Sequence, residues 1–251
     1  TQASVAVRLQ TSVRGRLTGI RHKSHSALAM ADSLIQSAFG GDGAAVEAQL
    51  AGAALDLNSS AGQGFAAIIG AASNGHLEIV RQLVTAGADV NVGRDEDGAT
   101  AIVMAAQNGH AAVVQFLVDS GANANAVTEQ QATALWLAAQ NGHAAVVGPL
   151  VDGGAEIDGP GRGGTSALFM AVQGSHADAV RILCERGANV TPEILMLASA
   201  VGNPGVSDLL EPGRLVVIAR VVEITQASEE AARAALMGSG WQLQQAILEC
   251  L

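Results

Sequence analysis

The ten residues AAQNGHAAVV occupy Ala105–Val114 and return unchanged at Ala138–Val147, an offset of 33 residues. Related copies, AASNGHLEIV and AVQGSHADAV, begin at Ala71 and Ala171, and two weaker ones, SAFGGDGAAV and LASAVGNPGV, begin at Ser37 and Leu197. A period of this length indicates stacked units, because each unit buries its apolar surface only against its neighbours.

Each unit reads as two short helices followed by a turn of small residues. In the third unit, Ala101–Asn108 predicts a first helix that ends at Gly109, a residue tolerant of the left-handed cap. Ala111–Asp119 predicts a second helix with a broad apolar stripe, ended by Gly121. Alanine and glycine supply 79 of the 251 residues, which favours closely packed helices.

Gly148 and Pro149 interrupt this pattern inside the second helix of the fourth unit. An interior proline removes a backbone hydrogen bond and costs about 3 kcal/mol or kinks the helix. We therefore expect a bend or early fraying there.

Period, glycine placement and helix pairs together resemble the ankyrin repeat family over residues 31–210, in about five or six units. The family's Thr-Pro-Leu-His opening is altered, but three units keep a hydroxyl that can cap backbone N–H groups. The four altered openings are Ala66-Ala-Ile-Ile, which has no hydroxyl, and Thr100-Ala-Ile-Val, Thr133-Ala-Leu-Trp and Ser166-Ala-Leu-Phe, which keep it. The resemblance implies an all-α helical solenoid with β-hairpin loops. Ile69, Val103, Trp136 and Phe169 would form an apolar stack where the family has its hydrogen-bond ladder.

The period stops before residues 211–251, where Leu215–Ile224, Glu229–Met237 and Trp241–Leu251 predict three short helices. Ser228 can cap the second of them. This segment resembles a ubiquitin-associated (UBA-like) three-helix domain. The resemblance implies a small docking module, with ubiquitin as one possible ligand.

Charge is distributed unevenly along the chain. The first 31 residues hold five basic side chains and no acid, so the other 220 hold 8 basic and 23 acidic ones. Residues 1–30 read as a basic N-terminal arm or the remnant of a targeting segment. The acidic remainder argues against nucleic-acid binding, and the apolar runs are too short for a membrane span. Two distant cysteines favour a reducing compartment, which leaves cytoplasm, mitochondrion and plastid open.

Four histidines recur with the repeat, namely His76, His110, His143 and His176. Packed helices lie about 8–10 Å apart, too far for neighbouring histidines to share a metal, so we expect each to order its own loop. Asp95-Glu96-Asp97 reads as a solvated acidic turn rather than a cation site, and Gly159–Gly164 as a hairpin tip rather than an anion site. No catalytic or cofactor motif was found, so we expect a chain that is not an enzyme.

The resemblance places partner contacts at the hairpin tips and at the ends of the first helices. The positions that match are Gln63, Phe65, Glu96, Asp97, Ala99, Gln107, Asn108, Glu129, Gln130, Gln140, Asn141, Arg162, Thr165 and Gln173. Trp136 and Phe169 are further candidates, as aromatic anchors or as packing between units. A basic segment is the expected partner for the acidic tips, and the chain's own N-terminal arm is one candidate.

These observations predict a recognition scaffold, held as an accessory subunit within a multi-subunit assembly. The alternative is a ubiquitin-pathway adaptor, with cargo on the repeats and ubiquitin on the C-terminal domain.

Overall fold

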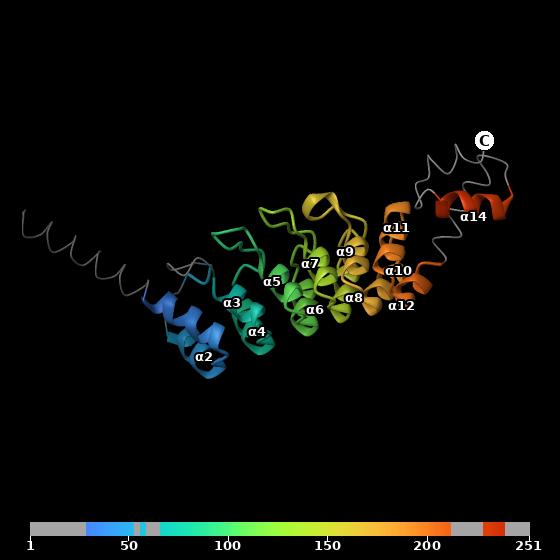
Figure 1. Ribbon diagram of the computed structural model, residues 1–251. Coiled ribbons are helices and arrows are strands. Elements are labelled where there is room, and N and C mark those ends of the chain that lie inside the picture. The colour runs from blue at the N-terminus through green and yellow to red at the C-terminus, as the bar shows by residue number, and fades with distance from the viewer. Residues whose placement is uncertain (1–28, 53–55, 59–65, 212–227, 239–251) are drawn as a thin grey trace, which may run out of the picture.

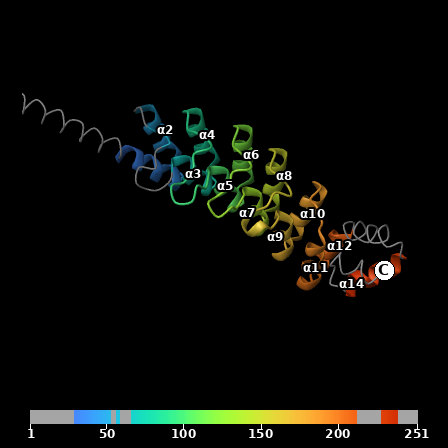
Figure 2. The ribbon, with the colours of Figure 1, turned by 90° about the horizontal axis from the view of Figure 1, so that it is seen from above.

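The computed structural model describes residues 29–52, 56–58, 66–211 and 228–238, and the structural statements below concern these residues. A helix over residues 29–40 opens the stack. The following helices form two parallel rows, which Figures 1 and 2 show from two sides. The first helices of the units are α3 (Ala67–Ser73), α5 (Ala101–Gln107), α7 (Ala134–Gln140), α9 (Ala167–Gln173) and α11 (Pro192–Val201). The second helices are α2 (Gly43–Gly52), α4 (Leu77–Thr85), α6 (Ala111–Asp119), α8 (Ala144–Asp152), α10 (Ala177–Glu185) and α12 (Pro204–Leu209).

Each helix contacts the corresponding helix of the next unit as well as its own partner, so the fold is the predicted helical solenoid. The loops between units project from the side of the first helices (Figure 1). Their hairpins are reduced to isolated bridges, Gly93 with Thr100 and Val127 with Thr133. A 3₁₀ turn, η1 (Arg162–Gly164), forms the tip in the fifth unit. No longer strand occurs in the described segments.

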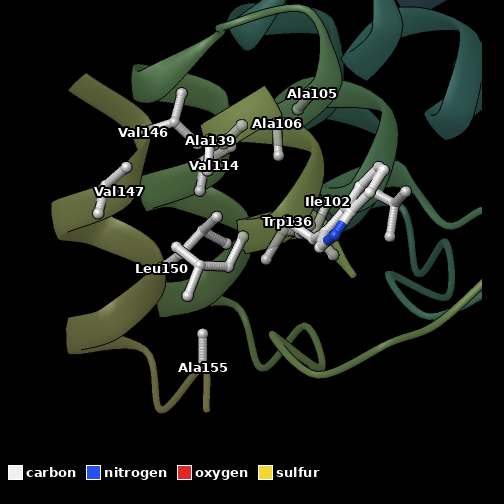
Figure 3. Packing of buried hydrophobic residues seen from close by; sticks show 14 of the residues in the cluster. Ile102, Ala105, Ala106, Val114, Trp136, Ala139, Val146, Val147, Leu150 and Ala155 are labelled. Atoms are coloured by element: carbon white, nitrogen blue, oxygen red, sulfur yellow. The ribbon is translucent and has the colours of Figure 1, made fainter. Parts of the chain in front are cut away.

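Small side chains set the close approach of the first helices. Ala105, Ala106, Ala138 and Ala139 are fully buried. The second helices supply the larger apolar groups, and Figure 3 shows Val146, Val147 and Leu150 of α8 in the same core as Ala105, Ala106 and Ala139. One continuous core therefore runs through all the units rather than a separate core in each.

The recurring histidines connect units. Nε2 of His110, His143 and His176 lies 3.0 Å from a backbone carbonyl of the preceding unit, and Nε2 of His76 lies 3.2 Å from one. A carbonyl oxygen only accepts, so each ring carries its proton on Nε2 and donates. The expectation that each histidine orders its own loop is therefore wrong. Sequence reasoning missed the cross-unit bond because the acceptor lies on a backbone 36 or 37 residues away.

Turn residues form a second ladder between units. Asn91 Oδ1 accepts from the N–H of Asn123, and Asn125 Oδ1 accepts from the N–H of Glu156, each at 2.8 Å. Asn58 and Asp158 make the same bond to the next unit, also at 2.8 Å. These bonds satisfy polar turn groups and fix the spacing between units.

Two features require glycine before His76, His110 and His143: the backbone angle and the space for the next unit's histidine. Gly109 has φ +80°, a left-handed conformation. A Cβ at Gly109 would also lie 2.6 Å from Nδ1 of His143 in the next unit. The fifth unit has Ser175 instead, with φ +59°, and the sixth unit has Asn203 where a histidine would stand. A Cβ is therefore present at position 175, in the one of these units whose following unit has no histidine ring for that Cβ to meet.

Replacing Ser175 by glycine is expected to raise the free energy of unfolding by about 0.5–1 kcal/mol. Left-handed backbone costs an L-residue about 1–2 kcal/mol, and the extra freedom of glycine in the unfolded chain offsets part of this gain. Urea unfolding followed by circular dichroism measures the change. Ser175→Ala, which keeps the Cβ, is the control and should show no gain. An equal rise in both variants would mean that the serine hydroxyl, not the backbone angle, is responsible.

Of the bend or early fraying predicted at Pro149, early fraying does not occur, so that part of the prediction is wrong. Helix α8 continues to Asp152 and has nine residues, as α6 and α10 do. Arg186, which follows the last residue of α10, donates to Asp152 and, at 3.5 Å, to the carbonyl of Gly148. Packing of fully buried Leu150 and this contact from the next unit hold the helix past the missing hydrogen bond.

Two of the three predicted hydroxyl caps form. Thr133 Oγ1 accepts from Trp136 N–H at 3.1 Å, and Ser166 Oγ accepts from Phe169 N–H at 3.2 Å. Thr100 makes no such bond, and its buried Oγ1 has no partner among the described residues, which corrects the prediction for that unit.

Near the C-terminus the structure describes one helix, α14 (Glu229–Gly238). Ser228 Oγ accepts from Ala231 N–H at 3.2 Å, as the cap prediction requires. The other two predicted helices, 215–224 and 241–251, lie outside the described residues, and so does nearly all of the N-terminal arm. No helix in the described segments is both long and apolar enough to cross a membrane.

Candidate protein-binding surface

The first helices of the second to fifth units present an uncharged surface. Helices α3, α5, α7 and α9 contain no charged residue. Gln107, Gln140 and Gln173 each end one of these helices, stand 33 residues apart and are exposed. None of the three side chains forms a hydrogen bond to another described residue. We call these glutamines the amide row.

The backbone beneath the amide row is fixed by the next unit. The carbonyl of Gln107 accepts from Nδ2 of Asn141 and from Nε2 of His143, each at 3.0 Å. The carbonyl of Gln140 accepts from Nε2 of His176 at 3.0 Å. These helix ends are therefore rigid, while the glutamine amides remain available to a partner.

An apolar row lies one helical turn before the amide row. It consists of Met104, Leu137 and Met170, which share one register. Met104 and Leu137 are half-buried, whereas Met170 is buried. Sequence reasoning missed this row. It could have been found from the glutamines, because the residue three positions before each of them lies on the same helix face and is apolar in all three units.

The loop tips carry the charge on this side of the molecule. Glu96, Glu129 and Arg162 are exposed and stand 33 residues apart. We call them the tip row. The N–H of Glu129 donates to the carbonyl of Asp97 at 2.9 Å, so neighbouring tips are linked. Along the stack the tip row presents two acids and then one base.

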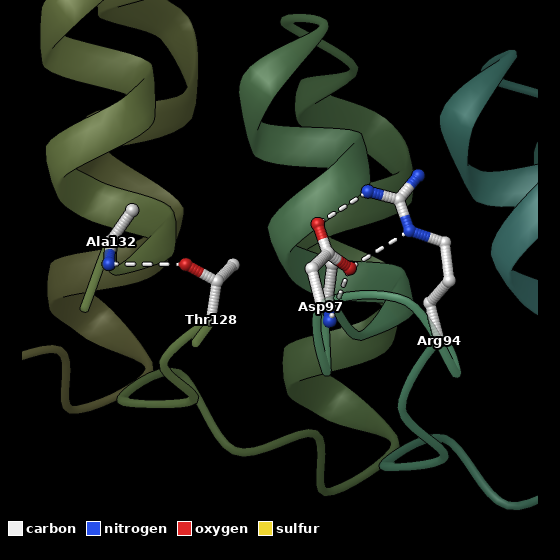
Figure 4. A network of polar contacts seen from close by, with 5 residues as sticks. Arg94, Asp97, Thr128 and Ala132 are labelled. Carbon is white, nitrogen blue, oxygen red and sulfur yellow. Dashed lines mark hydrogen bonds and ion pairs between the residues drawn. The ribbon is translucent and has the colours of Figure 1, made fainter. Parts of the chain in front are cut away.

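Inside the third unit's tip, Arg94 and Asp97 form an ion pair (Figure 4). Arg94 Nε donates to Asp97 Oδ1 at 2.8 Å, and the N–H of Ala99 donates to the same oxygen at 3.1 Å. The hydrogen bond from Arg94 lowers the pKa of Asp97, and it raises the pKa of Arg94. The side chain of Asp97 is only 16% exposed. Thr128 closes the next tip by accepting from Ala132 N–H at 3.2 Å (Figure 4).

Acidification is expected to weaken this tip. Because the pKa of Asp97 is lowered in the folded chain, its stabilisation is present above the unfolded-state pKa, near 3.9. It is lost as the pH falls through the lower folded-state pKa. Unfolding measured between pH 3 and 6 should therefore show a smaller loss of stability for Asp97→Asn than for wild type. Asp119→Asn, at an exposed helix end, should follow wild type; parallel curves for wild type and Asp97→Asn would contradict the assignment.

A family model for ankyrin repeats, in three copies, matches residues 34–128 and 123–194. The chain belongs to the ankyrin-repeat family. A comparison with curated proteins gave no match. Ankyrin repeats generally mediate interactions between proteins and are typically not enzymes, which makes a protein partner the expected ligand of this surface.

Trp136 contributes little surface to this ankyrin-repeat stack. It is 5% exposed, and its Nε1–H donates to Thr165 Oγ1 of the next unit at 3.0 Å. A Cβ at Gly161 would lie 2.1 Å from Cδ1 of Trp136, so the ring lies against that glycine. Phe169, in the same register, is half-buried. The structure thus places Trp136 in the packing between units.

The remaining predicted contact residues of the ankyrin repeats fall into four groups. Ala99 is buried, and Thr165 is half-buried against Trp136. The amides of Asn108 and Asn141 are exposed but donate to carbonyls of the preceding unit. Gln130 is exposed at a tip. Gln63 and Phe65 lie outside the described residues.

The described ankyrin repeats were also compared with what a metal site or a reactive thiol requires. No group of three or more His, Cys, Asp or Glu side chains is placed to hold a metal ion there. Burial raises the pKa of Cys184, which disfavours the nucleophilic thiolate.

Proposed function

We propose that this ankyrin-repeat protein is an accessory subunit that is held in a larger assembly through the face of its first helices. The observation that carries the proposal is an uncharged row of free glutamine amides on α5, α7 and α9, of which the backbone of the first two is held by the next unit. Charged groups are depleted at the buried centres of protein interfaces. Helices α3, α5, α7 and α9 have this composition, and the tips supply charge at the edge.

Low surface charge supports permanent association. Charged residues make up 14% of the chain, against about 25% in an average soluble domain. A free monomer gains solubility from charge, whereas a bound subunit buries much of its surface.

Charge inserted into the amide row should release the partners. Three tagged full-length proteins are purified from their source cells: wild type, the double variant Gln107→Arg/Gln140→Arg on the first helices, and the control Gln115→Arg on the second helix α6. The proteins that co-purify with wild type and Gln115→Arg should be lost with the double variant. Retention of all of them by the double variant would overturn the proposed surface.

Size measurement tests the subunit role separately. Light scattering after size exclusion of a native extract should place the chain in a complex much heavier than 25.2 kDa. A sharp monomer peak would contradict the accessory-subunit proposal. The ubiquitin adaptor alternative has no support in the described residues, because its C-terminal domain lies mostly outside them.

A further inference from the structure

The partner's chemistry follows from three rows that run along the third, fourth and fifth units. The apolar row lies between the glutamine amides at one end of the first helices and the charged tips at the other. A segment lying along the stack would therefore meet amides on one side, apolar side chains beneath, and charges on the other side. This inference rests on the proposed function, since it assumes that this face binds a protein.

The spacing of the units selects the backbone conformation of that segment. Packed helices repeat every 8–10 Å or so, and the glutamines repeat once per unit. A polyproline II segment advances about 3.1 Å per residue with three residues per turn, so equivalent groups return about every 9.3 Å. Its carbonyls make no internal hydrogen bonds and are free to accept from glutamine N–H groups.

Other conformations match less well. Peptide groups on one edge of a β-strand return every two residues, or about 6.8 Å, and lose register with the amide row after one unit. An α-helix uses its backbone carbonyls internally and offers the glutamines only side chains.

The tip row then fixes the pattern of charges. Glu96 and Glu129 face one side of the segment in neighbouring units, and Arg162 follows in the next. Residues at i, i+3 and i+6 of a polyproline II helix share one face. Complementary charges are therefore basic, basic and acidic at these three positions, in one chain direction or the other.

We propose that the first-helix face binds a polyproline II segment of a partner protein in which two basic residues and one acidic residue stand three residues apart and the residues between them are uncharged. Proline rings or other apolar groups rest on Met104 and Leu137. Carbonyls of the segment accept from the amide row, and its charged side chains pair with the tip row.

Capped, fluorescently labelled heptapeptides test the proposal on the full-length chain by fluorescence anisotropy. The first is Lys-Pro-Pro-Lys-Pro-Pro-Glu and the second is its reverse, because the structure allows either direction. A third, Lys-Val-Thr-Lys-Val-Thr-Glu, has the same charges but favours a β-strand. One proline-rich peptide should bind at least ten-fold more tightly than the Val/Thr peptide. Failure of both to bind, or equal binding of the Val/Thr peptide, would overturn the proposal.

Variants then separate backbone recognition from charge. Gln107→Ala and Gln140→Ala should each weaken the binding peptide about three- to ten-fold, whereas Gln115→Ala on α6 should leave it unchanged. Arg162→Glu should weaken binding of whichever proline-rich peptide binds wild type, and strengthen binding of the same peptide with lysine in place of its glutamate. This gain of binding cannot come from misfolding. Unchanged preference after Arg162→Glu would overturn the assigned charge pattern.

The two proposals fail differently. If Gln107→Arg/Gln140→Arg releases the cellular partners but no proline-rich peptide binds, the face binds proteins in another conformation. If that variant retains its partners, the proposed function itself is wrong.

Discussion

Replacing Trp136 by alanine is expected to lower the free energy of unfolding by about 3–5 kcal/mol, the range for large aromatic residues in a core. The indole is almost fully buried between the fourth and fifth units and lies against the backbone of Gly161. Its removal leaves a cavity at a contact between units and frees the hydroxyl of Thr165 from its bond to Nε1. A stack is stabilised mainly through such contacts, so loss at one of them weakens the whole array.

Urea unfolding followed by circular dichroism measures this loss. Trp136→Phe separates the two contributions, because phenylalanine fills most of the space but cannot donate to Thr165, and it should cost about 1–2 kcal/mol. Met196→Ala is the control for an exposed large side chain and should change stability by less than about 0.5 kcal/mol. A loss below about 1 kcal/mol for Trp136→Ala would show that the ring does not hold the two units together.

Local features of the fold were predictable from the sequence. The second helix of the third unit was expected at Ala111–Asp119 and α6 has those bounds. The first helix was expected to end at Asn108 and ends one residue earlier. Apolar period and glycine caps act within one helix, so a repeated local pattern determines them.

Features that depend on the neighbouring unit were not predictable. Pro149 was expected to bend or fray its helix, and fraying was wrong because sequence reasoning counts the lost hydrogen bond but not the support from Arg186, 37 residues later. The histidines were assigned to their own loops for the same reason. Thr100 looks like Thr133 in sequence, yet only Thr133 makes the cap bond.

The candidate surface divides in the same way. Gln107, Gln140 and Gln173 were identified as contact positions from their place in the repeat. The sequence could not show that Asp97 is held by Arg94 or that Asn141 is used by the preceding unit. These contacts reduce a long set of candidate residues to the glutamine amides and the exposed tips.

Replacing Gly109 by alanine should lower the free energy of unfolding by about 2–3 kcal/mol. The left-handed conformation of this residue accounts for about 1 kcal/mol, because alanine pays the steric cost that glycine avoids. The added Cβ also displaces the imidazole of His143, which then loses its hydrogen bond to the carbonyl of Gln107. Losing this bond costs about another 1–2 kcal/mol. Urea unfolding of Gly109→Ala and of wild type measures the difference in the free energy of unfolding.

A double-mutant cycle identifies the part that comes from the histidine. His143→Ala alone should cost about 1–2 kcal/mol for its hydrogen bond. Gly109→Ala on that background should cost about 1–2 kcal/mol less than it does in wild type, because no ring remains to be displaced. Additive effects would mean that the backbone angle alone requires glycine. Non-additive effects would show that each Gly-His step couples two units, with the glycine of one making room for the histidine of the next. The same coupling explains why a serine is tolerated at position 175, which is followed by a unit without that histidine.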